Sequence, residues 1–204
     1  MENSEWIQPI TLQGEHVALE PMALAHAGPL GKAVRDGELW CVWVTTAPSP
    51  EGAEAYVRAA LKRAQQEGGL AFVVRHKASG NIIGATRYLN VDATNQRLEI
   101  GGTWYAKSFQ RTAVNTESKL LLLTHAFERL EAIAVEFRTH WHNRASRAAI
   151  ARLGAKQDGI LRQHQKGPNG VYRDTVVFSI LNSEWPAVKQ GLQFSLEARS
   201  KPGR

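Results

Sequence analysis

The chain has 204 residues, of which 43% are hydrophobic and 22% charged, and this size and balance predict one globular domain rather than a disordered or fibrous chain. Apolar runs fall short of the roughly 18 to 20 residues that a membrane helix needs, and residues 1–5 lack the features of a secretory signal. The single cysteine, Cys41, excludes an intrachain disulfide, and we expect a cytoplasmic protein without membrane attachment.

Charge is distributed unevenly along the chain, whose net charge is +6. The window from Arg138 to Arg173 holds eight Lys or Arg residues and one acidic residue, Asp158, so it carries +7. Such a window predicts affinity for an anion, which could be a phosphorylated cofactor, an acidic protein surface or nucleic acid. A solvated basic face without a ligand is the alternative.

The amino-terminal half alternates between strands and helices. Hydrophobic periodicity and turn residues predict strands at 12–20, 70–75, 81–91 and 97–105 and helices at 24–35 and 51–67. A loop containing Trp40 and Trp43 separates the two helices. The strands at 70–75 and 81–91 are expected to form a hairpin.

The carboxy-terminal half continues this alternation. We predict helices at 116–130 and 143–154, strands at 133–141, 155–163 and 171–181, and a turn at Gly167-Pro168-Asn169-Gly170. The order of elements indicates a mixed α/β sheet. We expect an extension at 1–11, one domain at 12–190 and a tail at 191–204.

The strand at 97–105 and the loop after it carry the chemically informative residues. Alternation places Leu98, Ile100 and Trp104 on one face of the strand and Glu99, Thr103 and Tyr105 on the other. Residues 110–115 then lead into a helix. Unpaired backbone N–H groups at the start of a helix attract anions, so this junction predicts a site for a diphosphate.

Four short motifs support a family resemblance over most of the chain. They are Leu98-Glu99-Ile100-Gly101 with Trp104-Tyr105, the loop 110–115, Asn143-Arg144-Ala145-Ser146 followed by Leu153-Gly154-Ala155, and Tyr172-Arg173-Asp174. With these motifs the chain resembles the GNAT N-acetyltransferase superfamily, and within it the Rim-type enzymes that acetylate the amino termini of ribosomal proteins.

The resemblance implies a mostly antiparallel, twisted sheet of about seven strands flanked by helices, with the cofactor between the fourth and fifth strands. It implies direct transfer of an acetyl group from acetyl-CoA to a primary amine, either a protein amino terminus or a small-molecule amine. The cofactor-binding residues that it implies are Trp104, Tyr105, Gln110, Arg111, Thr112, Ala113, Val114, Asn115, Asn143 and Ser146.

Two positions depart from the pattern of that family. Ala113 and Asn115 stand where the loop usually has small residues that let the backbone approach the diphosphate, most often glycine at the first position. Ile150 stands where many members have a tyrosine that protonates the leaving thiolate. The hydroxyl of Ser146 is the nearest replacement for that acid.

Glu99 is the candidate general base, because an amine is protonated at neutral pH and must lose a proton before it attacks. An ordinary strand carboxylate is the alternative role. Trp40, Trp43 and Tyr172 are candidates for acceptor binding, and aromatic packing is their alternative.

Other functions receive less support from the sequence. His140 and His142 lack a third ligand, so we expect no metal. A non-catalytic module that binds CoA or nucleic acid on the same fold is the alternative function. No nucleic-acid motif is present in the sequence. The sequence leaves open whether the protein forms a homodimer.

Overall fold

The structure, a computed structural model, describes residues 6–167 and 170–200. Eight strands form one sheet in the order β1-β2-β3-β4-β5-β6-β8-β7, in which only β5 and β6 are parallel. The strands are β1 (Leu12–Gln13), β2 (Val17–Pro21), β3 (Leu70–His76), β4 (Ile82–Asp92), β5 (Arg97–Tyr105), β6 (Ala134–His140), β7 (Lys156–Lys166) and β8 (Tyr172–Leu181). The helices are α1 (Ala27–Arg35), α2 (Ala53–Glu67), α3 (Ala113–Glu128), α4 (Arg144–Ala151) and α5 (Trp185–Ser200). The predicted mixed, mostly antiparallel α/β fold is confirmed.

The sheet has eight strands rather than seven because the predicted strand at 12–20 is a hairpin of two strands. The backbone N–H groups of Glu15, His16 and Val17 donate to the carboxylate of Glu117 at 2.7, 2.8 and 2.8 Å. This carboxylate on α3 satisfies three donors of the tight turn, so the chain reverses there instead of continuing as one strand.

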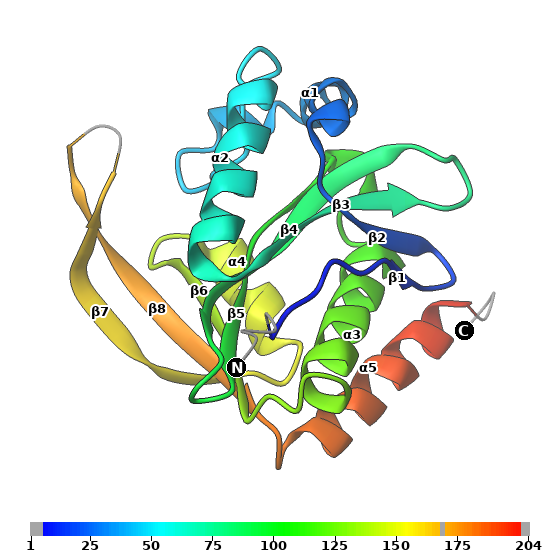
Figure 1. The fold of residues 1–204 in the computed structure, drawn as a ribbon, viewed down its shortest axis with the longest axis vertical. Coiled ribbons are helices and arrows are strands. Elements are labelled where there is room, and N and C mark those ends of the chain that lie inside the picture. Colours follow the sequence, from blue (N-terminus) through cyan, green and yellow to red (C-terminus); the bar gives the residue numbers. More distant parts are fainter. Residues whose placement is uncertain (1–5, 168–169, 201–204) are drawn as a thin grey trace, which may run out of the picture.

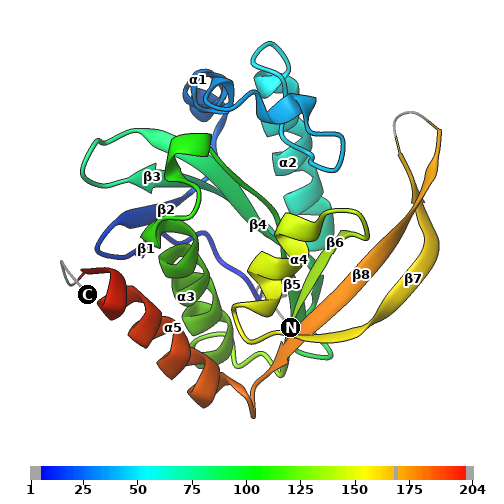
Figure 2. The same cartoon turned by 180° about the vertical axis from the view of Figure 1, so that it is seen from behind.

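Helices cover both faces of the sheet and enclose two separate cores (Figures 1 and 2). Helices α1 and α2 pack on the face formed by β3 and β4, where Val34 and Val57 are fully buried. Helices α3, α4 and α5 contribute to the core on the opposite face, where Leu122 and Leu123 are fully buried. The β7–β8 hairpin extends away from the body of the domain (Figure 1).

Helix α5 was not predicted from the sequence. It continues past residue 190, and both Trp185 and Leu192 are buried in the core against α3. The indole Nε1 of Trp185 donates to Glu128 Oε1 at 2.8 Å. The apolar spacing of Trp185, Val188 and Leu192 is the signal that could have indicated this helix.

Two further features bear on the sequence predictions. Within the predicted turn at 167–170, Pro168 and Asn169 lie outside the described residues. No helix in the described part of the chain is long and apolar enough to cross a membrane.

Candidate active site

Strands β5 and β6 separate in the middle of the sheet. They pair only from Arg97–Ala134 to Glu99–Glu136, although β5 continues to Tyr105 and β6 to His140. Past Glu99, no strand of the described chain pairs with β5 on this side. The unpaired backbone edge of β5 can therefore pair with an extended ligand that carries amide groups.

A β-bulge reverses the direction of the side chains within β5. The β4–β5 register shifts between Ala85 and Arg87, and Gly102 has a φ of 58°, in the left-handed region that glycine adopts readily. Tyr105 therefore joins the same core as Leu98, whereas Trp104 packs in the core of α1 and α2. The predicted placement of Trp104 on the face of Leu98 was wrong, because unbroken alternation does not hold across a bulge.

Trp104 and Glu99 consequently share the sheet face on which α2 lies. The indole Nε1 of Trp104 donates to the hydroxyl of Tyr56, on α2, at 3.0 Å. On the opposite face, Lys119 Nζ donates to Thr103 Oγ1 at 2.7 Å and fixes the bulge against α3. The bulge thus sets which backbone groups of β5 face the separation between the strands.

Glu99 lies where β5 and β6 separate, and only 6% of its surface is exposed. Its Oε2 accepts a hydrogen bond from Asn90 Nδ2 at 2.5 Å and lies 3.6 Å from Arg138 Nε. Burial raises the pKa of the Glu99 carboxyl, while Arg138 and Asn90 act in the opposite direction. A raised pKa suits a carboxylate that accepts protons near neutral pH.

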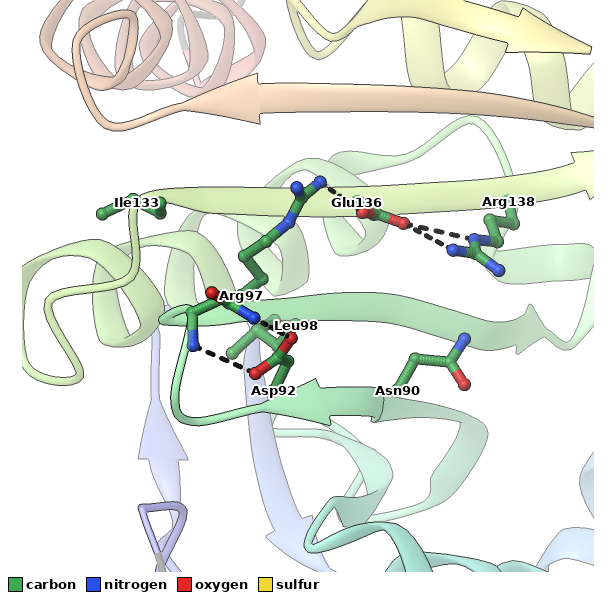
Figure 3. Close-up of a pocket in the computed structure, with 8 residues that line it drawn as sticks. Asn90, Asp92, Arg97, Leu98, Ile133, Glu136 and Arg138 are labelled. Atoms are coloured by element: carbon green, nitrogen blue, oxygen red, sulfur yellow. Dashed lines mark hydrogen bonds and ion pairs between the residues drawn. The ribbon is translucent and has the colours of Figure 1, made fainter.

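A cavity of about 550 Å³ is lined by residues of β4, β5 and β6 (Figure 3). Asn90 and Arg138, which both contact Glu99, contribute to its lining. Figure 3 shows Arg97 of β5 reaching Glu136 of β6, which in turn contacts Arg138. Charged and amide groups from three strands therefore line this cavity, and two of its residues contact Glu99.

The loop at 110–115 opens α3 as predicted, although the helix begins at Ala113 rather than at about residue 116. Arg111 has a φ of 61°, and Thr112 Oγ1 accepts a hydrogen bond from the backbone N–H of Val114 at 3.3 Å. Ala113, Val114 and Asn115 thus form the first turn, where backbone N–H groups lack partners within the helix. The loop is tied to β5, because Gln110 Nε2 donates to the carbonyl of Tyr105 at 2.9 Å.

Asn143 caps α4 as predicted, because its Oδ1 accepts a hydrogen bond from the backbone N–H of Ser146 at 3.0 Å. Its Nδ2 donates to the carbonyl of Val44 at 3.4 Å, which connects this helix start to the loop before α2. Ser146 is half-buried in the first turn, and Ile150 is buried in the core.

No ring contact in the described chain joins the three aromatic candidates for acceptor binding to one another. Trp43 is 72% exposed, and its ring packs against the rings of His140 and His142 at centroid distances of 5.0 and 5.8 Å. Trp40 packs against the core of α1 and α2, and Tyr172 is exposed at the start of β8. Among the described residues, no group of three or more His, Cys, Asp or Glu side chains could hold a metal.

The cations of the basic window are spread over several elements of the structure. They lie on β6, α4, β7 and β8 and between them. Ion pairs join Arg138 to Glu136, Lys156 to Glu184 and Arg162 to Asp174. These contacts neutralise part of the surface that nucleic acid would require.

Sequence reasoning missed Asn90 and Arg138, which hold Glu99. Asn90 lies on the strand antiparallel to β5, so hairpin pairing of the predicted strands could have indicated it. Arg138 lies on β6, whose parallel register with β5 has no local signal in the sequence.

The open mixed sheet, the separated β5 and β6 and the helix that starts beside them define an acyltransferase-like α/β fold. The model of the acetyltransferase (GNAT) domain family matches residues 16–156. The chain therefore belongs to the GNAT acetyltransferase family and is an N-acetyltransferase.

Individual relatives agree with this assignment. A Bacillus subtilis (strain 168) protein, YdaF, whose name gives ribosomal N-acetylation as its proposed activity, is 31% identical over 155 residues, covering 72% of this chain and 80% of the relative. A GCN5-related N-acetyltransferase structure from Brucella melitensis is 31% identical with a TM-score of 0.80, covering 93% of this chain and 86% of that chain. Mycobacterium smegmatis RimJ in complex with CoA-disulfide shares the fold, with a TM-score of 0.76, 21% identity and coverage of 94% and 96%. These relatives include the Rim-type branch that the sequence motifs indicated.

Proposed function

We propose that this enzyme transfers the acetyl group of acetyl-CoA directly to a primary amine, with a protein amino terminus as the acceptor. The observation that carries this proposal is the buried carboxylate of Glu99 at the point where β5 and β6 separate. This arrangement places a candidate base beside an open strand edge, on the sheet face opposite the α3 helix.

The residues present fit acetyl-CoA. The first turn of α3 offers N–H groups that lack partners within the helix, and the positive end of the helix dipole, for the diphosphate, with Thr112 as its cap. Ala113 and Asn115 are accommodated as helical residues in this turn, so the fold forms the loop without glycine. The open edge of β5 would hold the amide-bearing arm, and Trp104 and Tyr105 lie on that strand.

Glu99 would act on the acceptor. When bound, acetyl-CoA supplies an acetyl group activated as a thioester. An α-amine has a pKa of about 8, so most of it is protonated at pH 7 and the carboxylate of Glu99 removes that proton. Asn90 and Arg138 keep this carboxylate oriented toward the separation of the strands.

Ser146 would assist the leaving group. It lies in the first turn of α4, and its hydroxyl could donate a proton to the departing sulfur. The side chain of Ile150 is buried in the core and cannot supply a proton. A thiol with a pKa of about 8.5 leaves tolerably without full proton transfer, so this contribution is secondary.

The Rim-type relatives favour a protein amino terminus over a small amine as the acceptor. The name of the Bacillus relative refers to ribosomal N-acetylation, and such an acceptor would place this enzyme in the cytoplasm. Trp43, exposed beside His140, is the aromatic candidate best placed to contact a polypeptide near the end of β6.

The test is a measurement of CoA release with a panel of amino-terminal peptides and small amines, with product masses determined for each. We expect acetylated peptide and stoichiometric CoA. Efficient acetylation of small amines with none of peptides would contradict the proposed acceptor. Release of CoA without any acetylated product would contradict the transfer itself.

A further inference from the structure

Two half-buried arginines of the sheet form no ion pair with an acidic residue of the described chain. Arg87, on β4, and Arg173, on β8, are half-buried, and the Nε atom of each is buried without a hydrogen-bond partner in the described chain. No ion pair joins either of them to a carboxylate of the described residues. By contrast, Arg97 and Arg138 of the same sheet both pair with Glu136.

Arg87 and Glu99 both lie on the face of the sheet that α2 covers. A Cβ at Gly101 would lie 2.7 Å from Glu99 Oε1, and a Cβ at Gly102 would lie 3.2 Å from Arg87 Nε. The two side chains therefore lie over neighbouring residues of β5. The guanidinium of Arg87 also stacks over the ring of Tyr56, with its Cζ 4.6 Å from the ring centroid.

Arg173 lies on β8, which pairs with β6 on the side away from β5. In the β6–β8 register, Arg138 is opposite Val177 and His140 is opposite Thr175. Because side chains two residues apart share a face, Arg173 lies on the face of Arg138 and His140. Burial lowers the pKa of Arg173, and the charge of Glu99 acts in the opposite direction, so the two groups interact electrostatically.

The buried Nε of each guanidinium is a strong donor that lacks a hydrogen-bond partner in the described chain. Its planar arrangement of N–H groups matches a carboxylate, which can accept two parallel hydrogen bonds. The diphosphate of the cofactor has its own donors in the first turn of α3, on the opposite face of the sheet. Arg87 and Arg173 therefore remain available to the acceptor.

We propose that Arg87 and Arg173 bind a carboxylate that the acceptor carries close to its reacting amine. Glu99 then faces the amine while the two guanidinium groups hold the anion. This inference rests on the proposed function and specifies its acceptor as acidic. The carboxylate has two chemical sources: an acidic side chain near the amino end of a polypeptide, or the free carboxylate of a small amino acid.

Two matched pairs of acceptors distinguish these sources. The peptides Ala-Glu-Ala-Ala and Ala-Gln-Ala-Ala, both with an amidated carboxy terminus, differ in one side-chain charge. Alanine and alaninamide differ only in the free carboxylate. We expect kcat/KM to favour the acidic member of the peptide pair, or of the amino-acid pair, by at least about 10-fold, as a charged hydrogen bond provides.

Variants assign this preference to the two arginines. Arg87→Gln and Arg173→Gln should each reduce the acidic-to-neutral ratio toward 1, while the KM for acetyl-CoA stays unchanged. Arg87→Lys keeps the charge above Tyr56 and should retain part of the ratio. The control is Arg58→Gln, which removes an exposed arginine of α2 that pairs with Glu54 and should leave the ratio as in the wild type.

A binding measurement separates failure of this inference from failure of the proposed function. Calorimetry with the same four acceptors and the CoA-loaded protein requires no turnover, and we expect the preferred acidic member to bind at least about 10-fold more tightly. Absence of acetyl transfer with this preference intact would contradict only the proposed function. Three results would overturn the inference. They are equal binding of the two acceptors within both pairs, an acidic preference that survives in both Arg87→Gln and Arg173→Gln, and a raised KM for acetyl-CoA in these two variants. Thermal melts verify that each variant is folded.

Discussion

Asn90 Nδ2 donates a hydrogen bond of 2.5 Å to Glu99 Oε2, so a residue of β4 holds the carboxylate of β5 that lies where the sheet opens. Arg138, on β6, approaches the same oxygen to 3.6 Å. The carboxylate is thus held from both neighbouring strands. Burial raises the pKa of Glu99, and these two contacts limit that rise by stabilising the charged form.

Removing either contact should change the pH profile of the enzyme. Asn90→Ala or Arg138→Gln destabilises the ionised carboxylate, so the pKa of Glu99 rises further and less base is available in mild acid. The acidic limb of the pH profile of kcat/KM should move to higher pH. We expect kcat/KM to fall several-fold at pH 6 and to change little at pH 8.5. Asn95→Ala, at the same cavity but in contact with Asp92, is the control. A limb that does not move in Asn90→Ala and Arg138→Gln would show that Glu99 does not set it.

Ser146→Ala should lower turnover by roughly 5- to 50-fold, which is less than the effect of removing the base. A thiolate can leave without a proton, whereas a protonated amine cannot attack at all. Steady-state kinetics with Ser195→Ala, on α5, as a control would measure the difference. A defect larger than that of Glu99→Gln would reverse the roles assigned to the two residues.

Thr112→Asp should weaken the binding of acetyl-CoA by about 10-fold or more. Asp is as good a helix cap as Thr, so α3 should stay intact while the added negative charge repels the diphosphate. Calorimetry would measure Kd, and Thr94→Asp on the exposed β4–β5 turn provides the same charge change elsewhere. Unchanged affinity in Thr112→Asp would show that the phosphates of acetyl-CoA do not bind at the start of α3.

The buried Lys119 should make stability depend on pH. Burial lowers the pKa of Lys119 from 10.5 to about 7, so between these values the unfolded chain binds more protons than the folded one. The free energy of unfolding therefore gains a contribution that increases as pH rises from about 7 to 10.5. Lys119→Met removes this contribution, so its stability relative to the wild type should fall as pH rises.

Urea unfolding at several pH values measures this dependence. Lys62→Met, at an exposed position of α2, is the control and should show no such change. If the difference in the free energy of unfolding between Lys119→Met and the wild type is constant from pH 6 to 9.5, this result would contradict a partly neutral, buried lysine.

The sequence predicted the fold class and most elements because periodicity and turn residues are local signals. Alternation placed Glu99 opposite Leu98 and Ile100, as the structure shows. It failed at Trp104, because the bulge at Gly102 depends on pairing with β4 and on Lys119 of α3. The adjacent glycines at 101 and 102 are a local signal of an irregular strand that the prediction did not use.

Tertiary contacts explain the other differences. The split of the first strand requires the carboxylate of Glu117, about 100 residues away in the chain. The partners of Glu99 come from β4 and β6. Helix α3 separates β6 from β5 in the chain. Neither contact could be inferred from residues near Glu99 in the sequence.

The rate of acetyl transfer by Glu99→Gln across a pH series tests the central claim most directly. The substitution keeps the shape of the side chain and removes the base, so kcat/KM at pH 7 should fall by about 10²- to 10⁴-fold. The defect should shrink at high pH, where the amine is already neutral, and the Kd for acetyl-CoA should stay near the wild-type value. Wild-type activity of the variant at pH 7 would contradict the assignment of Glu99 as the base at this site.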